Sequence, residues 1–155
     1  MENKNNKTFY NQILTDHNLN PSNKLKLDDA NLVLEGVNPS CGDDIILQLH
    51  VGEDGTIEDG AFEGSGCAIS QASVDIMLDL VIGRKKEEAL ELADKFMRMI
   101  KGTASEEEIA SLEEAGALRD ISHMPARVKC AVLGWHTMEE MLEKDSPKMK
   151  PVSKV

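Results

Sequence analysis

Three cysteines and one aspartate in this 155-residue chain have the residue types and the spacing of metal ligands. Cys41 and Asp43 stand two residues apart with Gly42 between them, and a glycine lets the backbone turn tightly enough for both side chains to reach one point. Pro39 disfavours helix just before them, so the pair is expected on a loop. A thiolate and a carboxylate directed at one point suit a metal ion such as zinc.

Cys67 and Cys130 are the other two cysteines, and both are expected near helix starts. Cys67 follows Gly-Ser-Gly at 64–66, which breaks the preceding strand, and a helix N-terminus stabilises a thiolate through its dipole and free N–H groups. With Cys41 and Asp43 they could complete a tetrahedral zinc site. Each cysteine alone could instead be a small buried apolar residue, because the chain has no C-x-x-C pair.

A zinc ion with three thiolates and a carboxylate carries excess negative charge and needs cations nearby. Arg127 and Lys129 flank Cys130 and are the candidates for this compensation. They point to different sides of a helix, so only one is expected to serve the site. For the pair taken by itself, solvated helix charges are the simpler interpretation, and Asp43 taken by itself could cap a turn.

The hydrophobic pattern predicts the elements that bring the four residues together. Strands are predicted over 32–37, 44–51 and 56–63, the last two joined by the Asp-Gly turn at 54–55. Helices are predicted over 8–17, from Cys67 to Gly83, over 86–100, from the Ser-x-x-Glu capping box at 105–108 onward, and over 125–144. This pattern predicts an α+β fold in which a three-stranded antiparallel sheet packs against about five helices. One domain is expected over 1–145, followed by a disordered tail over 146–155.

Composition excludes several classes of partner. The chain has 17 basic and 28 acidic residues and a net charge of −11, so it gains nothing from counterion release on nucleic acid. No apolar run is long enough for a membrane span and the N-terminus has no signal-peptide pattern, which predicts a cytoplasmic protein. Three cysteines in that compartment argue against a disulfide framework.

Three ordered motifs resemble the SufU family of iron–sulfur cluster assembly proteins, relatives of the IscU scaffolds in the IscU/NifU superfamily. They are Asn-Pro-Ser-Cys-Gly-Asp at 38–43, Gly-Ser-Gly-Cys-Ala-Ile-Ser at 64–70 and Arg-Val-Lys-Cys at 127–130. The family's opening helix and loop are matched by Tyr10, Ile13, Asp16, His17, Pro21 and Asn23. IscU scaffolds carry a histidine where this chain has Lys129, and they lack its extra residues at roughly 101–120. In both features this chain is similar to SufU.

The resemblance implies a zinc protein that works with a pyridoxal-phosphate cysteine desulfurase of the SufS type. It implies that Cys41, Asp43, Cys67 and Cys130 hold the zinc, and that a histidine of the desulfurase takes the place of Cys41 on the metal. The freed Cys41 would then accept sulfur as a persulfide, which makes the chain a zinc-dependent sulfurtransferase that supplies downstream iron–sulfur assembly machinery.

Two alternatives to the sulfur acceptor remain open. In the first, the chain is an IscU-like scaffold on which iron and sulfide form a transient cluster at the same cysteines. In the second, it is a non-catalytic protein in which zinc is purely structural. The Cys-Gly-Asp loop argues against the second alternative, because structural zinc sites prefer four cysteine or histidine ligands.

Overall fold

An antiparallel sheet organises the chain in the computed structural model, which describes residues 12–144 and 153–154. Its long strands are β1 (Leu32–Asn38), β2 (Asp43–Val51) and β3 (Ile57–Ser65), and β2 pairs with both of the others. Each lies within two residues of its predicted ends. The predicted three-stranded antiparallel sheet is therefore confirmed.

Helices follow the sheet in the order that the sequence predicts. They are α2 (Ala68–Val81), α3 (Lys86–Lys101), α4 (Glu106–Ser111), the 3-10 helix η1 (Glu113–His123) and α5 (Pro125–Lys144), and residues 12–19 form a helix before the sheet. The start of the first predicted helix, over 8–11, lies outside the described residues. None of the described helices combines the length and the apolar character needed to cross a membrane. The α+β class is confirmed.

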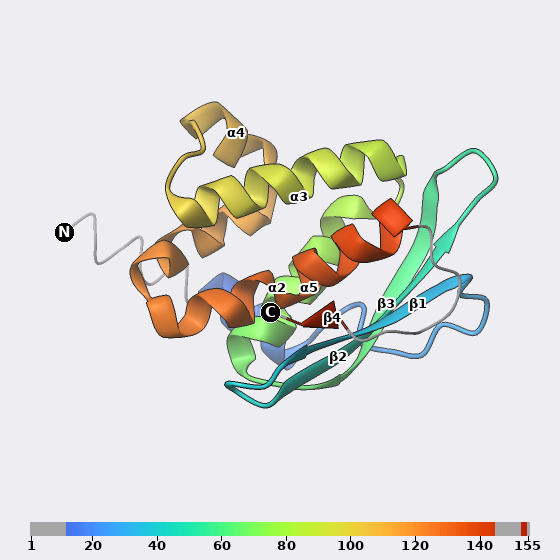
Figure 1. Cartoon of the computed structure of the whole chain (residues 1–155), viewed down its shortest axis with the longest axis horizontal. Helices are drawn as coiled ribbons and strands as arrows, with labels where there is room; N and C mark the ends of the chain where they lie inside the picture. The colour runs from blue at the N-terminus through green and yellow to red at the C-terminus, as the bar shows by residue number, and fades with distance from the viewer. Residues whose placement is uncertain (1–11, 145–152, 155) are drawn as a thin grey trace.

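The helices stack in layers on one face of the sheet (Figure 1). α2 and α5 lie side by side against the strands, α3 packs against α5, and η1 contacts α2, α3 and α5. Trp135 of α5 stacks on Phe96 of α3 with ring centroids 4.1 Å apart, and its Nε1 donates to Ser73 Oγ of α2 at 3.0 Å. One buried indole therefore ties the three central helices together.

A short strand, β4 (Ser153–Lys154), extends the sheet to the order β3-β2-β1-β4. It runs parallel to β1 at Gly36 and Val37. The structure thus differs from the expected disordered tail at these two residues, while 146–152 and Val155 lie outside the described residues. The physical reason is that β1 would otherwise present an open row of backbone N–H and C=O groups at the sheet edge.

The turn between β1 and β2 places polar residues at the inner face of the sheet. Burial alternates along β1 and along β2 from Asp43 to Leu47, and the register pairs Asn38, the last residue of β1, with Asp43, the first of β2. Gly36 lets α5 pack closely, because a Cβ there would meet Thr137 and Leu133. The start of α5, with Cys130, therefore lies over the β1–β2 turn.

Candidate metal centre

Three of the four predicted ligands meet at the β1–β2 turn. One possible ligand atom from each of Cys41, Asp43 and Cys130 lies within 4.8 Å of the others. The two sulfurs are 3.6 Å apart. Asp43 and Cys130 are buried, whereas Cys41 is exposed on the turn. The floor of the site is therefore formed by buried residues, and Cys41 is the ligand that solvent can reach.

Cys67 joins the site from the N-terminus of α2, as the sequence predicts. Its thiol caps the helix by accepting the N–H of Ser70 at 3.4 Å, and its own N–H donates to Asp43 Oδ1 at 2.9 Å. The Cys67 sulfur lies outside this group of three, but its interaction with Cys130 adds to the effect of burial in raising the pKa of that thiol. Cys41, Asp43 and Cys130 thus form one group, and Cys67 is joined to it through the Asp43 carboxylate.

Three hydrogen-bond donors hold the Asp43 carboxylate. The Cys67 N–H and the Ser70 hydroxyl donate to Oδ1 at 2.9 and 3.2 Å, and Asn38 Nδ2 donates to Oδ2 at 3.1 Å. Gly66 leaves the room for this contact, since a Cβ there would lie 2.7 Å from Asp43 Oδ1. Over the described residues, no ion pair with lysine, arginine or histidine involves Asp43. A buried carboxylate so placed suits coordination of a cation.

Arg127 and Lys129, the two cations predicted to compensate the negative charge of the site, differ in their interaction with the thiols. Hydrogen bonding to Cys130 and the charges of the three thiols raise the pKa of Arg127, so this guanidinium lies near the thiols although the residue is exposed. Lys129 is exposed on α5. Burial raises the pKa of Cys130 above its usual 9.0, and bonds with the Cys67 and Cys41 thiols raise it further. A metal ion that binds here must displace the proton of Cys130.

The donor set fits zinc. Three thiols and one carboxylate supply four ligands of the kinds found in zinc sites, and Arg127 supplies a positive charge beside them. Three thiols also suit iron in an iron–sulfur cluster. The donor set therefore suits either zinc or iron.

Comparison with known proteins assigns the family. The profile of the NifU-like N-terminal domain matches residues 9–150. This chain belongs to the NifU-like N-terminal domain family. It is 42% identical over 140 residues to the iron–sulfur cluster assembly scaffold protein IscU of Thermotoga maritima, covering 90% of this chain and 96% of that protein.

Further relatives span both names used within the family. The zinc-dependent sulfurtransferase SufU of Bacillus subtilis is 39% identical over 138 residues, covering 89% of this chain and 92% of that protein. A crystal structure of a SufU of Fervidobacterium islandicum, described as a scaffold protein for the SUF system, matches with a TM-score of 0.79 and 37% identity. It covers 84% of this chain and 94% of that one. These matches confirm the resemblance to IscU and SufU.

Two polar residues of this NifU-like site were not predicted from the sequence. Asn38 and Ser70 are fully buried and both bond Asp43. Strand alternation inward from Leu34 and Gly36 would have placed Asn38 on the inner face. Among the described residues, no histidine joins the group of Cys41, Asp43 and Cys130. His50 pairs with Glu58, and His136 with Glu140.

A second polar cluster, around His17, lies apart from the thiols and was also missed. His17 Nδ1 lies 2.7 Å from Asp75 Oδ2 and its Nε2 lies 2.7 Å from Glu114 Oε1. Asp75 is fully buried and also accepts from the N–H and side chain of Asn23. Its four-residue spacing from Gln71 and Asp79 is typical of the polar face of a helix. This network attaches the N-terminal segment to α2 and η1.

Raising the pH is expected to weaken this network. Burial lowers the pKa of His17, but hydrogen bonds to Asp75 and Glu114 outweigh it, so the pKa lies above its usual 6.5. The added stability is therefore fully present below pH 6.5 and is lost as the pH rises through the folded pKa. His17→Gln should remove this pH dependence, and Glu114→Gln should reduce it, in urea unfolding measured on both sides of pH 6.5. An unchanged dependence in His17→Gln would contradict the assignment.

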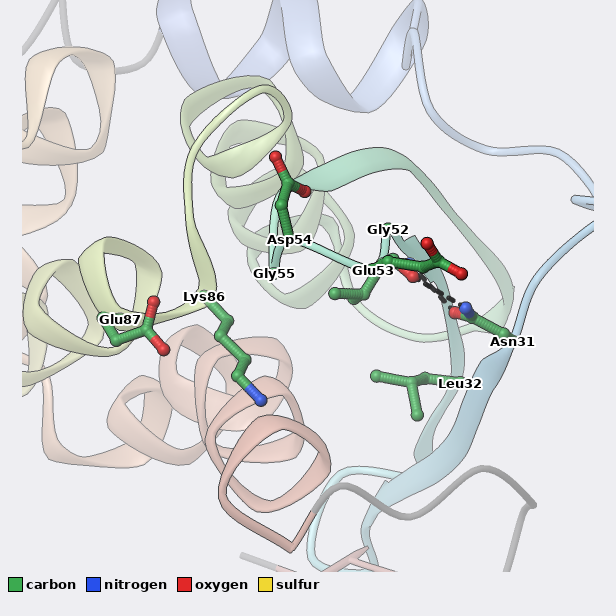
Figure 2. Close-up of a pocket in the computed structure, with 9 residues that line it drawn as sticks. Asn31, Leu32, Gly52, Glu53, Asp54, Gly55, Lys86 and Glu87 are labelled. Carbon is green, nitrogen blue, oxygen red and sulfur yellow. Dashed lines mark hydrogen bonds between the residues drawn. The ribbon is translucent and has the colours of Figure 1, made fainter.

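A surface pocket of about 520 Å³ lies away from the metal centre. Figure 2 shows Asn31 and Leu32 on one side of it and Lys86 and Glu87 on the other. The remaining lining residues are Val51, Gly52, Glu53, Asp54 and Gly55. β2 has 9 residues and runs from Asp43 at the metal centre to Val51 at the pocket, a length of roughly 27 Å. None of the candidate ligands lines this pocket, so it is separate from the thiol site.

Proposed function

We propose that this chain is a zinc-dependent sulfur acceptor in iron–sulfur cluster assembly. It takes sulfur from a pyridoxal-phosphate cysteine desulfurase of the SufS type in the cytoplasm and passes it to the downstream assembly machinery. The observation that carries the proposal is the contrast in exposure among the ligands: Cys41 is exposed, while Asp43 and Cys130 are buried. An acceptor thiol must reach a partner while the other ligands stay in place. The B. subtilis relative named a zinc-dependent sulfurtransferase supports the same role.

The transfer itself is a thiol–disulfide exchange. The Cys41 thiolate attacks the terminal sulfur of the desulfurase persulfide, and a new S–S bond forms on Cys41. The S–S bond of the donor breaks, and its electron pair leaves with the desulfurase cysteine as a thiolate. The step needs no added oxidant or reductant. Zinc, held by Cys41, Asp43, Cys67 and Cys130, would keep the thiols ionised without redox chemistry of its own.

A scaffold that assembles a transient iron–sulfur cluster is the second candidate. It is favoured by the T. maritima relative, which carries the scaffold name and covers nearly the whole chain. The three thiols would bind iron in that case. This candidate predicts bound iron with matching sulfide after anaerobic reconstitution.

The deciding experiment combines metal analysis with a sulfur-transfer assay. The chain is purified without oxygen and without added metal, and then incubated with a SufS-type desulfurase and L-cysteine. About one zinc per chain and one added sulfur on Cys41, located by peptide mass spectrometry, are expected. Iron with matching sulfide would favour the scaffold, and zinc without sulfur uptake or desulfurase stimulation would favour a structural zinc protein.

A further inference from the structure

We propose that Asn38 is a positioning residue of the metal centre, which holds the oxygen of Asp43 that binds the metal. The inference deepens the proposed function, because it requires that this site bind a metal ion. Asn38 ends β1, pairs in register with Asp43 and is fully buried. Its contacts reach three of the four candidate ligands.

The side-chain amide of Asn38 contacts two ligands directly. Nδ2 donates to Asp43 Oδ2 at 3.1 Å, and it also donates to Cys130 Sγ at 3.8 Å. An amide nitrogen carries two hydrogens, so each of these contacts has its own donor. One amide therefore holds two candidate ligands, Asp43 and Cys130, at the same time.

The backbone of Asn38 holds the third ligand. Its carbonyl oxygen accepts the N–H of Cys41 at 3.2 Å and the N–H of Gly42 at 3.0 Å. Gly42 has a φ of 75°, the left-handed conformation that this turn requires. Asn38 therefore closes the turn that carries Cys41 and bonds the Asp43 carboxylate that follows it.

The two oxygens of the Asp43 carboxylate differ in how many hydrogen bonds they accept. A carboxylate oxygen has two lone pairs. Oδ1 already accepts two hydrogen bonds, from the Cys67 N–H and the Ser70 hydroxyl. Oδ2 accepts one from the Asn38 amide, and the carboxylate also interacts with the Cys130 thiol, whose proton a bound metal displaces. Oδ2 therefore keeps a lone pair for a metal ion, and Asn38 is the residue that orients it.

The amide oxygen of Asn38 indicates that this residue does more than fill space in the core. Its Oδ1 is buried and lacks a hydrogen-bond partner among the described residues. Such an atom is costly, and an apolar side chain of similar size would avoid the cost. The two donor contacts of Nδ2 are therefore the property that distinguishes asparagine from leucine at this position.

Cobalt binding tests the inference without any activity assay. Co²⁺ reports its ligands by absorption, and the full chain is titrated with it. Asn38→Ala should weaken Co²⁺ binding roughly 10- to 100-fold, the usual effect of losing a contact behind a ligand. Its absorption bands should shift toward those of Asp43→Ala. The isosteric Asn38→Asp should bind Co²⁺ still more weakly, because a second carboxylate would face Asp43.

Asn23→Ala is the matched control for a buried asparagine. Asn23 Nδ2 also donates to carboxylates, Asp75 and Asp79, but these lie in the His17 cluster. This variant should lower the unfolding temperature and keep the parent Co²⁺ affinity and spectrum. If Asn38→Ala lowers only the unfolding temperature, as Asn23→Ala does, Asn38 is a structural residue and the inference is overturned.

The double variant Asn38→Ala/Asp43→Ala tests whether Asn38 acts through Asp43. If it does, the double variant should bind Co²⁺ about as weakly as Asp43→Ala alone, because effects within one network are not additive. Fully additive losses would overturn the inference and leave the sulfur-acceptor role standing. A parent chain that binds neither zinc nor Co²⁺ would overturn the proposed function together with the inference.

Discussion

Asp43→Asn is expected to lower zinc affinity by more than about 100-fold, beyond the 10- to 100-fold typical of an outer contact. The amide keeps the volume of the carboxylate but removes its charge. It also turns one acceptor into a donor, although donors approach both oxygens of Asp43 in the native site. The variant therefore loses the carboxylate ligand. Its new amide N–H group also faces one of the native donors, which come from Asn38, Cys67 and Ser70. Competition with a colorimetric zinc chelator measures the affinity.

Asp44→Asn is the matched control for this prediction. Asp44 is the next residue of β2, so its side chain points to the opposite face of the sheet. A hydrogen bond with Asp44 is the largest cause that raises the pKa of Glu35, which places Asp44 beside that carboxyl. Removing the Asp44 charge should leave zinc binding unchanged. Equal zinc loss in both variants would show that general charge, and not ligation by Asp43, governs the affinity.

The local placement of Cys41, Asp43 and Cys67 could be predicted from the sequence, because a local rule fixes each one. Gly42 fixes the turn that carries Cys41, and the break at 64–66 fixes Cys67 at a helix start. Strand alternation through Ile45, Leu47 and Leu49 is confirmed, and one step backward places Asp43 on the same inner face. That these residues bind zinc stays a prediction.

Contacts between distant segments could not be predicted in this way. Asp75 belongs to a polar stripe of its helix, yet it is buried because His17 and Asn23 cover it from more than 50 residues away. The capping box at Ser105 is confirmed, but α4 ends at Ser111, and Glu113 with a φ of 52° starts a 3-10 helix instead. A two-residue strand such as β4 has too few residues for any periodicity.

Sequence alone also could not decide whether Arg127 or Lys129 compensates the charge of the site. Helical geometry predicts that only one of them faces the site, but it does not fix which one without the packing of α5. Both residues are exposed, and Arg127 is the one whose pKa the nearby thiols raise. Sequence spacing therefore supplies the alternatives, and tertiary packing decides between them.

Cys41→Ala is expected to abolish sulfur uptake from the desulfurase while zinc remains bound at about one ion per chain. Catalytic zinc sites hold the metal with three protein ligands and an open fourth position, so Asp43, Cys67 and Cys130 suffice. The buried positions of Asp43 and Cys130 support this division, because Cys41 is the exposed member of the set. Peptide mass spectrometry after incubation measures the sulfur, and metal analysis measures the zinc.

Cys130→Ala is the control variant for Cys41→Ala. Cys130 is buried against Cys41 and Asn38, so its loss should release zinc and disturb the whole centre. Sulfur uptake should then fall together with metal content, whereas Cys41→Ala separates the two. Normal sulfur uptake by Cys41→Ala would reject Cys41 as the acceptor. Loss of zinc in both variants would show that Cys41 is needed to hold the metal, and exposure would then no longer distinguish acceptor from ligand.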